Sequence, residues 1–214
     1  MSGILGTKVG MSQIFNEKGE RVPVTLISTE GRIVVQKKTV DKDGYNAVQL
    51  GVGKKSAHKV SSVIRKHFEK ANAKPTRWVR EIRLDDVSPY ELGKEVPLDF
   101  LIPGVLVNIR GTTKGRGFAG AIKRWNFSGG PMNKGSTFHR RVGSIGNHTF
   151  PKRVFKGRPM PGHYGVDQQT VRNIELIDVL RDEKIVVLKG SIPGSKNSLV
   201  EIRLAKSVTP KKEE

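Results

Sequence analysis

The sequence predicts a mainly β protein with some α structure (an α+β fold), whose middle is a long, irregular and basic segment. Three observations lead to this prediction. Short runs rich in β-branched residues, bounded by turn residues, lie toward both ends of the chain. One stretch alone has the apolar spacing of an amphipathic helix. Residues 100–166 contain no aspartate or glutamate, and long parts of them show neither helical nor strand periodicity.

Seven runs are predicted to be strands because β-branched residues dominate them. They are residues 21–28, 32–38, 46–52, 105–111, 171–180, 184–190 and 198–205. The Asp43-Gly44 pair predicts a tight hairpin turn between the second and third runs. Residues 190–198 are polar and rich in glycine and serine, which predicts a turn between the last two strands.

One helix is predicted near residues 58–72. Its apolar positions recur at intervals of three and four, so they share one face. They are Val60, Val63, Ile64, His67, Phe68 and Ala71. Pro75 ends the helix. His67 on that face is expected to be packed or capping rather than a ligand.

The charge of the chain points to a polyanionic partner. The 214 residues include 39 Lys+Arg against 20 Asp+Glu, for a net charge of +19. Nucleic acid is favoured over an acidic membrane. The absence of cysteine excludes a disulfide framework and a thiolate zinc site. There is no secretory h-region with a cleavage site and no run of 18 apolar residues, so we expect a cytoplasmic protein with no membrane partner.

The acid-free segment 100–166 carries most of this charge. Its twelve lysines and arginines give +12, which leaves +7 for the rest of the chain, and it also contains thirteen glycines. A compact domain rarely holds so long an irregular segment unless that segment is functional or disordered.

Gly115, Gly117 and Gly120 have the G-x-G-x-x-G spacing of a dinucleotide-binding turn. That motif also needs a helix after the glycines and an acid about 20 residues further on. Here only residues 121–127 could be helical, and the next acid is Asp167. We therefore reject dinucleotide binding.

Other small-molecule sites are also not supported. In residues 130–136 the lysine precedes the glycine, whereas a P-loop needs it afterwards. The spacing of His139, His148 and His163 fits no common metal site. The segment contains no acid for a hydrolytic triad or a carboxylate pair. We expect no enzyme, cofactor, metal or small-molecule substrate.

Cations, glycines and aromatic residues are instead mixed together in this segment. Lysine and arginine neutralise phosphates, glycine lets the backbone approach them closely, and aromatic rings stack on unpaired bases. For Phe118 and Phe127, packing is as plausible as base contact. No recognition helix is evident, so folded RNA fits this mixture better than duplex DNA.

The stretch from Leu101 through Asn108, Gly111, Thr113, Gly115-Arg116-Gly117, Gly120 and Arg124 resembles the signature of the large-subunit ribosomal protein L3 family, bacterial type. Further segments in the same order resemble that family over nearly the whole chain. They are residues 3–15, 43–51, 138–146, 153–165 and 171–179.

The resemblance implies a β-barrel body like that of translation factors, with a small α+β part, formed by residues 1–110 and 166–205. It implies that residues 111–165 are an rRNA-binding loop reaching toward the peptidyl transferase centre, with 143–156 nearest to it. The expected partners are large-subunit rRNA and neighbouring ribosomal proteins, with a non-catalytic role that begins early in subunit assembly. We expect residues 206–214 to be a mobile tail.

Charge and resemblance together predict the residues that contact rRNA. They are Lys114, Arg116, Lys123, Arg124, Trp125, Lys134, His139, Arg140, Arg141, Asn147, His148, Lys152, Arg153, Lys156, Arg158 and His163.

The chain departs from the family pattern at a few positions. Lys134, Val142 and Lys152 stand where histidine, proline and glycine are usual. Residues 147–149 lack the glutamine that some members methylate, so we expect no such modification. The main alternative is a general RNA-binding or architectural protein outside the ribosome. A nucleic-acid enzyme that uses Asp167 or His163 and a membrane-surface role are less favoured.

Overall fold

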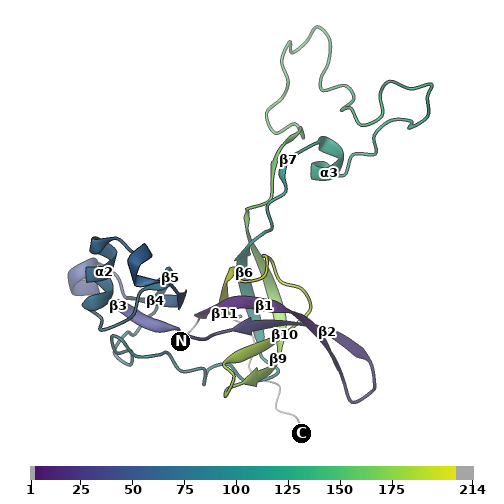
Figure 1. Ribbon diagram of the computed structural model, residues 1–214. Helices are drawn as coiled ribbons and strands as arrows, with labels where there is room; N and C mark the ends of the chain where they lie inside the picture. Colours follow the sequence, from purple (N-terminus) through teal and green to yellow (C-terminus); the bar gives the residue numbers. More distant parts are fainter. Residues whose placement is uncertain (1–2, 206–214) are drawn as a thin grey trace. The chain divides into compact units, whose positions relative to one another are not determined.

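The computed structural model describes residues 3–205, so the predicted tail at 206–214 lies outside the described residues. The protein is mainly β (Figure 1). The described residues divide into two compact units, residues 3–112 with 168–205, and residues 113–167. We call the first unit the body and the second the extension.

Six antiparallel strands of the body are hydrogen-bonded in a closed ring, in the order β1-β11-β6-β9-β10-β2. They are β1 Gly3–Phe15, β2 Arg21–Ser28, β6 Leu106–Thr112, β9 Gln168–Leu180, β10 Ile185–Lys189 and β11 Leu199–Leu204. The first strand pairs with the last, with Gly3 opposite Arg203. The five predicted strands of this ring are confirmed, whereas β1 was not predicted.

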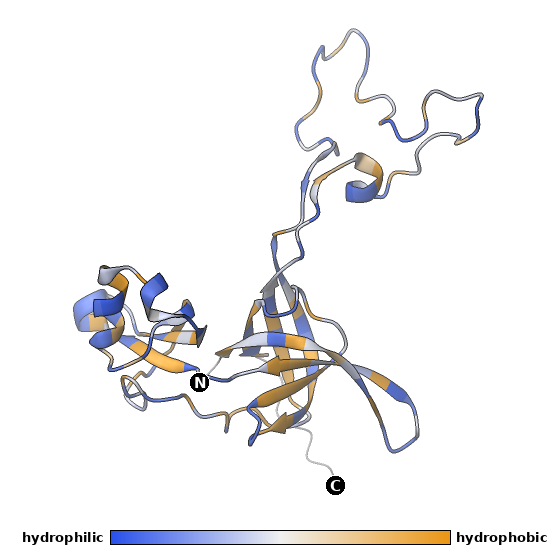
Figure 2. Cartoon of the chain, in the orientation of Figure 1, coloured by the Kyte–Doolittle hydropathy of each residue, from blue (hydrophilic) through white to orange (hydrophobic). Residues whose placement is uncertain are grey.

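The ring encloses an apolar core because alternate residues of each strand face inward. Figure 2 shows the apolar residues concentrated on these strands. Leu101, which precedes β6, is also fully buried in this core. The buried strand residues of the core are Ile4, Ile27, Val107, Ile109, Ile174, Leu176, Val186, Leu188, Val200 and Ile202.

A three-stranded antiparallel sheet forms the rest of the body, in the order β3 (Ile33–Lys38), β4 (Ala47–Lys54) and β5 (Thr76–Arg83). Strands β3 and β4 match the prediction, whereas β5 was missed. A short 3₁₀ turn (Ala57–Lys59) and helix α2 (Ser62–Glu69) connect β4 to β5.

The predicted helix exists but is shorter than expected, because it begins at Ser62 and ends at Glu69. Phe68 is buried as predicted, whereas Val63 is 77% exposed and Ile64 is 46% exposed. Val60 and Ala71 are buried but lie outside the helix. Helical spacing therefore does not relate these two residues to the others, and the single apolar face predicted for residues 58–72 was wrong.

The predicted tight turn between β3 and β4 was also wrong. A one-turn helix, α1 (Val40–Asp43), makes this connection. Gly44 follows it with φ +80°, and its N–H donates to the Val40 carbonyl at 2.9 Å. The Asp-Gly pair thus ends a helical turn, in which glycine adopts the left-handed conformation that is common there.

Candidate nucleic-acid interface

The extension begins and ends in a narrow antiparallel neck. Short strands β7 (Gly117–Ala119) and β8 (Gly162–Tyr164) pair with each other. Between these strands and the two ends of the extension, the Arg116 N–H donates to the Tyr164 carbonyl at 2.8 Å, and the Thr113 N–H donates to the Asp167 carbonyl at 2.9 Å. Backbone hydrogen bonds rather than an apolar core therefore hold the neck together.

The three glycines of the G-x-G-x-x-G stretch shape this neck. A Cβ on Gly115 would lie 2.9 Å from Val166 Cγ2, and Gly117 has φ +65°. Gly120 is the N-cap of helix α3 (Ala121–Trp125). The helix has five residues and β7 pairs antiparallel, whereas a dinucleotide site needs a parallel βαβ unit. The glycines permit close backbone packing and a turn here.

Two of the predicted RNA contacts form an internal clamp. Arg124 Nη1 and Trp125 Nε1 both donate to the Met160 carbonyl at 2.9 Å. The Arg124 guanidinium lies 5.1 Å from the centre of the Trp125 ring. A Cβ on Gly162 would lie 2.5 Å from Arg124 Nη1, so this glycine makes room for the clamp. Arg124 therefore joins the two sides of the extension, while Trp125 remains 46% exposed.

Residues 126–161 contain no helix or strand, and Figure 1 shows them as an irregular trace. Local hydrogen bonds give this segment its form. The Gly130 N–H donates to the His139 carbonyl at 2.7 Å, and His139 Nδ1 lies 3.0 Å from the Pro131 carbonyl. Arg158 Nη2 donates to the Ser144 carbonyl at 2.7 Å. These bonds leave most side chains exposed.

The lysines and arginines of the extension have no carboxylate partners within the extension. Residues 113–167 contain eleven lysines and arginines, and Asp167 is their only acid. All eight ion pairs of the described residues lie in the body. Arg124 and His139 are half-buried, and every other predicted contact residue is exposed. The exposed ones are Lys114, Arg116, Lys123, Trp125, Lys134, Arg140, Arg141, Asn147, His148, Lys152, Arg153, Lys156, Arg158 and His163.

Aromatic side chains lie among these cations. The Arg116 guanidinium lies 5.5 Å from the Tyr164 ring centre, and that of Arg153 lies 6.0 Å from the Phe155 ring centre. Phe118 is 81% exposed, so its ring is free for a partner, whereas Phe127 is half-buried. Guanidinium groups beside exposed rings are typical of surfaces that bind phosphates and unpaired bases.

The histidines of the extension do not come together. His139 contacts Pro131, His148 Nδ1 lies 2.9 Å from Thr149 Oγ1, and His163 pairs with Phe118 across the neck. Within residues 3–205, no group of three metal-ligating side chains is found. No helix in this part of the chain is long and apolar enough to cross a membrane.

A second basic region lies in the body and was not predicted from the sequence. Residues 54–80 contain nine lysines and arginines but only one acid, Glu69. The net charge of +7 for all residues outside 100–166 does not indicate this local concentration. The signal that could have identified the region is the excess of eight cations over acids within residues 54–80.

Comparison with known proteins shows the family of this chain. The sequence model of the family described as ribosomal protein L3 matches residues 97–184. The large ribosomal subunit protein uL3 of Thermotoga maritima is 48% identical over 212 residues, which cover 99% of this chain and 100% of that protein. The uL3 proteins of Carboxydothermus hydrogenoformans and Pelotomaculum thermopropionicum are 48% and 49% identical over 203 residues, or 95% of this chain and 97% and 96% of theirs. Relatives this similar over their whole length identify the chain as a member of the ribosomal protein L3 family.

Proposed function

We propose that this protein is a structural component of the large ribosomal subunit, that it binds large-subunit rRNA, and that it supports early subunit assembly. The observation that carries the proposal is the extension, whose exposed cations have no carboxylate partners. Family membership supplies the identity of the RNA. The role is structural rather than enzymatic.

In this proposal the extension binds rRNA by its backbone and by its unpaired bases. Exposed cations such as Arg140, Arg141 and Lys152 contact phosphates and release condensed counterions. Exposed rings such as Phe118 and Phe155 stack on bases, a contact worth about 1–3 kcal/mol per base. The irregular backbone suits a path between RNA helices, because it needs no groove of fixed width.

The two parts of the chain have different tasks in this proposal. The closed ring corresponds to a translation-factor-like β-barrel and, with the small sheet, forms a body from residues 1–110 and 166–205. This body lies on the outer face of the subunit, beside neighbouring ribosomal proteins. Residues 111–165 run inward, with residues 143–156 nearest the peptidyl transferase centre. The support for this placement is the resemblance to the family.

Sedimentation of a tagged copy through a sucrose gradient at high salt tests the proposal. We expect the protein to remain with the large subunit at about one copy per particle, because contacts ordered on folded RNA resist salt better than non-specific ones. A copy that salt strips into the light fractions would instead favour a general RNA-binding protein outside the ribosome.

A charge-matched pair of variants makes this test specific. Arg140→Glu with Arg141→Glu reverses two cations of the extension, and Lys18→Glu with Lys42→Glu reverses two exposed cations of the body. The first pair should reduce incorporation into the subunit, and the second should not. Equal incorporation of both variants would contradict a role for the extension.

A further inference from the structure

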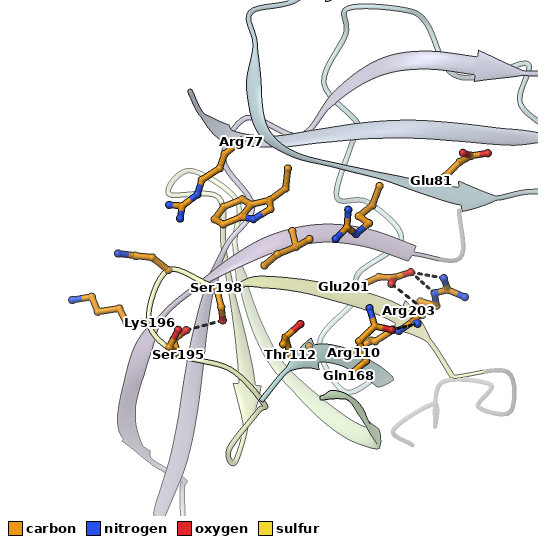
Figure 3. A pocket seen from close by; sticks show the side chains of 15 residues that line it. Arg77, Glu81, Arg110, Thr112, Gln168, Ser195, Lys196, Ser198, Glu201 and Arg203 are labelled. Atoms are coloured by element: carbon orange, nitrogen blue, oxygen red, sulfur yellow. Dashed lines mark hydrogen bonds and ion pairs between the residues drawn. The ribbon is translucent and has the colours of Figure 1, made fainter. Parts of the chain in front are cut away.

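A groove of about 750 Å³ lies on the body, and every residue that lines it belongs to the body (Figure 3). Side chains of β5, β6 and β11 line it, together with those of the loop 190–198 and of Gln168 at the start of β9. We call it the body groove. The proposed function, as stated above, does not use it.

Cations dominate the body groove. Arg77, Arg80, Arg110, Lys196 and Arg203 line it, against only two carboxylates. Each carboxylate already has partners in the protein. Glu201 pairs with Arg203 and lies 3.9 Å from Arg110, at one end of the groove in Figure 3.

The second carboxylate, Glu81, accepts a hydrogen bond from the Tyr45 hydroxyl at 2.6 Å and pairs with Lys38 at 3.2 Å. No carboxylate among residues 3–205 lies within ion-pair distance of Arg77, Arg80 or Lys196. These three side chains therefore carry positive charge that only an external anion can neutralise.

Arg77 is ordered by an aromatic ring. Its guanidinium lies 4.4 Å from the centre of the Trp78 ring. Gly53 supports that ring, because a Cβ there would lie 3.0 Å from Trp78 Cζ3. A guanidinium stacked on an indole is a flat, oriented cation, and such cations suit both phosphate oxygens and base planes.

The opposite wall of the groove is also fixed. The Asn197 N–H donates to the Lys8 carbonyl at 2.7 Å, and the Lys8 N–H donates to the Ser198 carbonyl at 3.0 Å. The Lys8 ammonium donates to the Ile192 carbonyl at 2.9 Å inside the body. The loop 190–198 is thus anchored at several points, which lowers the ordering cost of binding a ligand.

We propose that the body groove binds an unpaired nucleotide of RNA together with its flanking phosphates, as a second RNA site independent of the extension. Arg77, Arg80 and Lys196 contact the phosphates, and the stacked Arg77–Trp78 pair contacts the base. The Gln168 amide oxygen already accepts a hydrogen bond from Arg110 Nη2, but its amide N–H groups and the Asn197 amide lie in the same lining and can hydrogen-bond to base edges. An acidic protein segment would satisfy the charges but not the stacking surface. The choice of RNA as the ligand rests on the proposed function.

The two tryptophans of the chain allow each site to be observed separately, because Trp78 lines the body groove and Trp125 lies in the extension. In the full-length Trp125→Phe variant, Trp78 is the only indole. Adding a single-stranded oligouridylate of twelve nucleotides should then quench tryptophan fluorescence in a saturable manner that weakens with salt.

Reversal of the groove's charge should reduce this binding. Arg77→Glu with Lys196→Glu, made in the Trp125→Phe background, should raise the apparent Kd at least about tenfold, and the magnitude of the salt slope should fall by about 1.4 for two lost phosphate contacts. The matched control, Lys18→Glu with Lys42→Glu, has the same net charge and should change the Kd by less than about twofold, because exposed charges at a distance are screened. Far-UV circular dichroism checks that both variants are folded.

Three outcomes would overturn the proposal. Trp78 fluorescence could fail to respond, or both charge-reversal pairs could weaken binding equally. Polyglutamate of the same charge could quench Trp78 as strongly as RNA, which would assign the groove to an acidic protein segment. The Trp78→Phe variant reports the extension through Trp125. A response of Trp125 without one of Trp78 defeats only the body groove, whereas silence of Trp125 counts against the proposed function.

Discussion

The body and the extension belong to one chain but differ in how they bury apolar side chains and neutralise charged ones. Of the buried apolar residues in the described chain, only Ala119 and Ala121 lie in the extension. The body contains all of the ion pairs within residues 3–205. The body thus buries its own apolar surface and neutralises many of its own charges, while the extension leaves both tasks to a partner.

This difference shows what each segment needs in order to be ordered. Folding must offset a backbone entropy cost of about 1–2 kcal/mol per residue. The body offsets this cost with its apolar cores, whereas the extension buries too little to do so. The extension should therefore gain its order when it binds polyanionic RNA.

Limited proteolysis of the free protein should separate the two regions most strongly. Trypsin should cut near Arg140 and Arg141 at least about a thousandfold faster than within the ring, because reaching the ring's sites requires unfolding that costs about 5–15 kcal/mol. Mass spectrometry of early fragments measures this, and added large-subunit rRNA should protect the extension. If the extension resisted trypsin as well as the body does in the absence of RNA, the extension would not depend on RNA for its order.

Truncation of one buried side chain in the body and one exposed side chain in the extension should change the free energy of unfolding by very different amounts. Leu188 is fully buried in the ring, so Leu188→Ala should lower the free energy of unfolding by about 2–5 kcal/mol. Phe155 is 59% exposed, so Phe155→Ala should change it by no more than about 0.5 kcal/mol. Urea unfolding followed by circular dichroism measures both. A large loss for Phe155→Ala would show that the extension has a packed core.

Removal of two cations from the extension should weaken RNA binding without affecting folding. Arg140→Ala with Arg141→Ala should weaken affinity for single-stranded rRNA fragments about tenfold and reduce the salt slope by about 1.4. The unfolding free energy should remain within about 0.5 kcal/mol, since both side chains are exposed. Filter binding over a range of salt concentrations measures the slope. An unchanged slope would mean that these arginines do not contact phosphates.

The smallest expected effect concerns pH and the body alone. The hydrogen bond from Tyr45, together with that from Lys38, lowers the pKa of Glu81 below its usual value. Because the pKa is lower in the folded state, the carboxylate stabilises the body above its ordinary pKa, near 4.3, and this stabilisation is lost as pH falls through the folded value.

Glu81→Gln should therefore flatten the loss of stability below about pH 4.5, by no more than about 1 kcal/mol for a partly exposed ion pair. Denaturant unfolding at several pH values measures this change. Glu17→Gln removes an exposed carboxylate that makes no ion pair in the described chain, and it is the control for the loss of one negative charge. Identical profiles for the Glu81→Gln variant and the unaltered protein would contradict the role of Glu81.

The sequence predicted those parts of the fold that depend on local patterns. Runs of β-branched residues identified β2, β3, β4, β6, β9, β10 and β11. Strand β1 was missed because glycines interrupt it. These glycines allow close packing against neighbouring strands, which the sequence does not show. A Cβ on Gly6 would lie 2.5 Å from Ile27 Cγ2 of the neighbouring strand. Strand β5 was missed because three arginines and a glutamate interrupt its apolar residues.

The candidate site was predictable as a segment but not in its internal roles. An absence of acids over 67 residues is visible in the sequence. The interaction of Arg124 with the Met160 carbonyl is not, because 36 positions separate the two residues. The body groove escaped prediction for the same reason, since its lining comes from four separate parts of the chain.

The pairing of β1 with β11 also sets the order of events during synthesis of the chain. The ring cannot close until Leu204 has left the exit tunnel, because the last strand lies between the first strand and β6. The extension is complete at residue 167, so 37 residues remain between it and ring closure. At about 5–20 residues per second, their synthesis takes roughly 2–7 s. The extension emerges from the exit tunnel ahead of the last strand, so it can capture RNA while its own body is still unfinished.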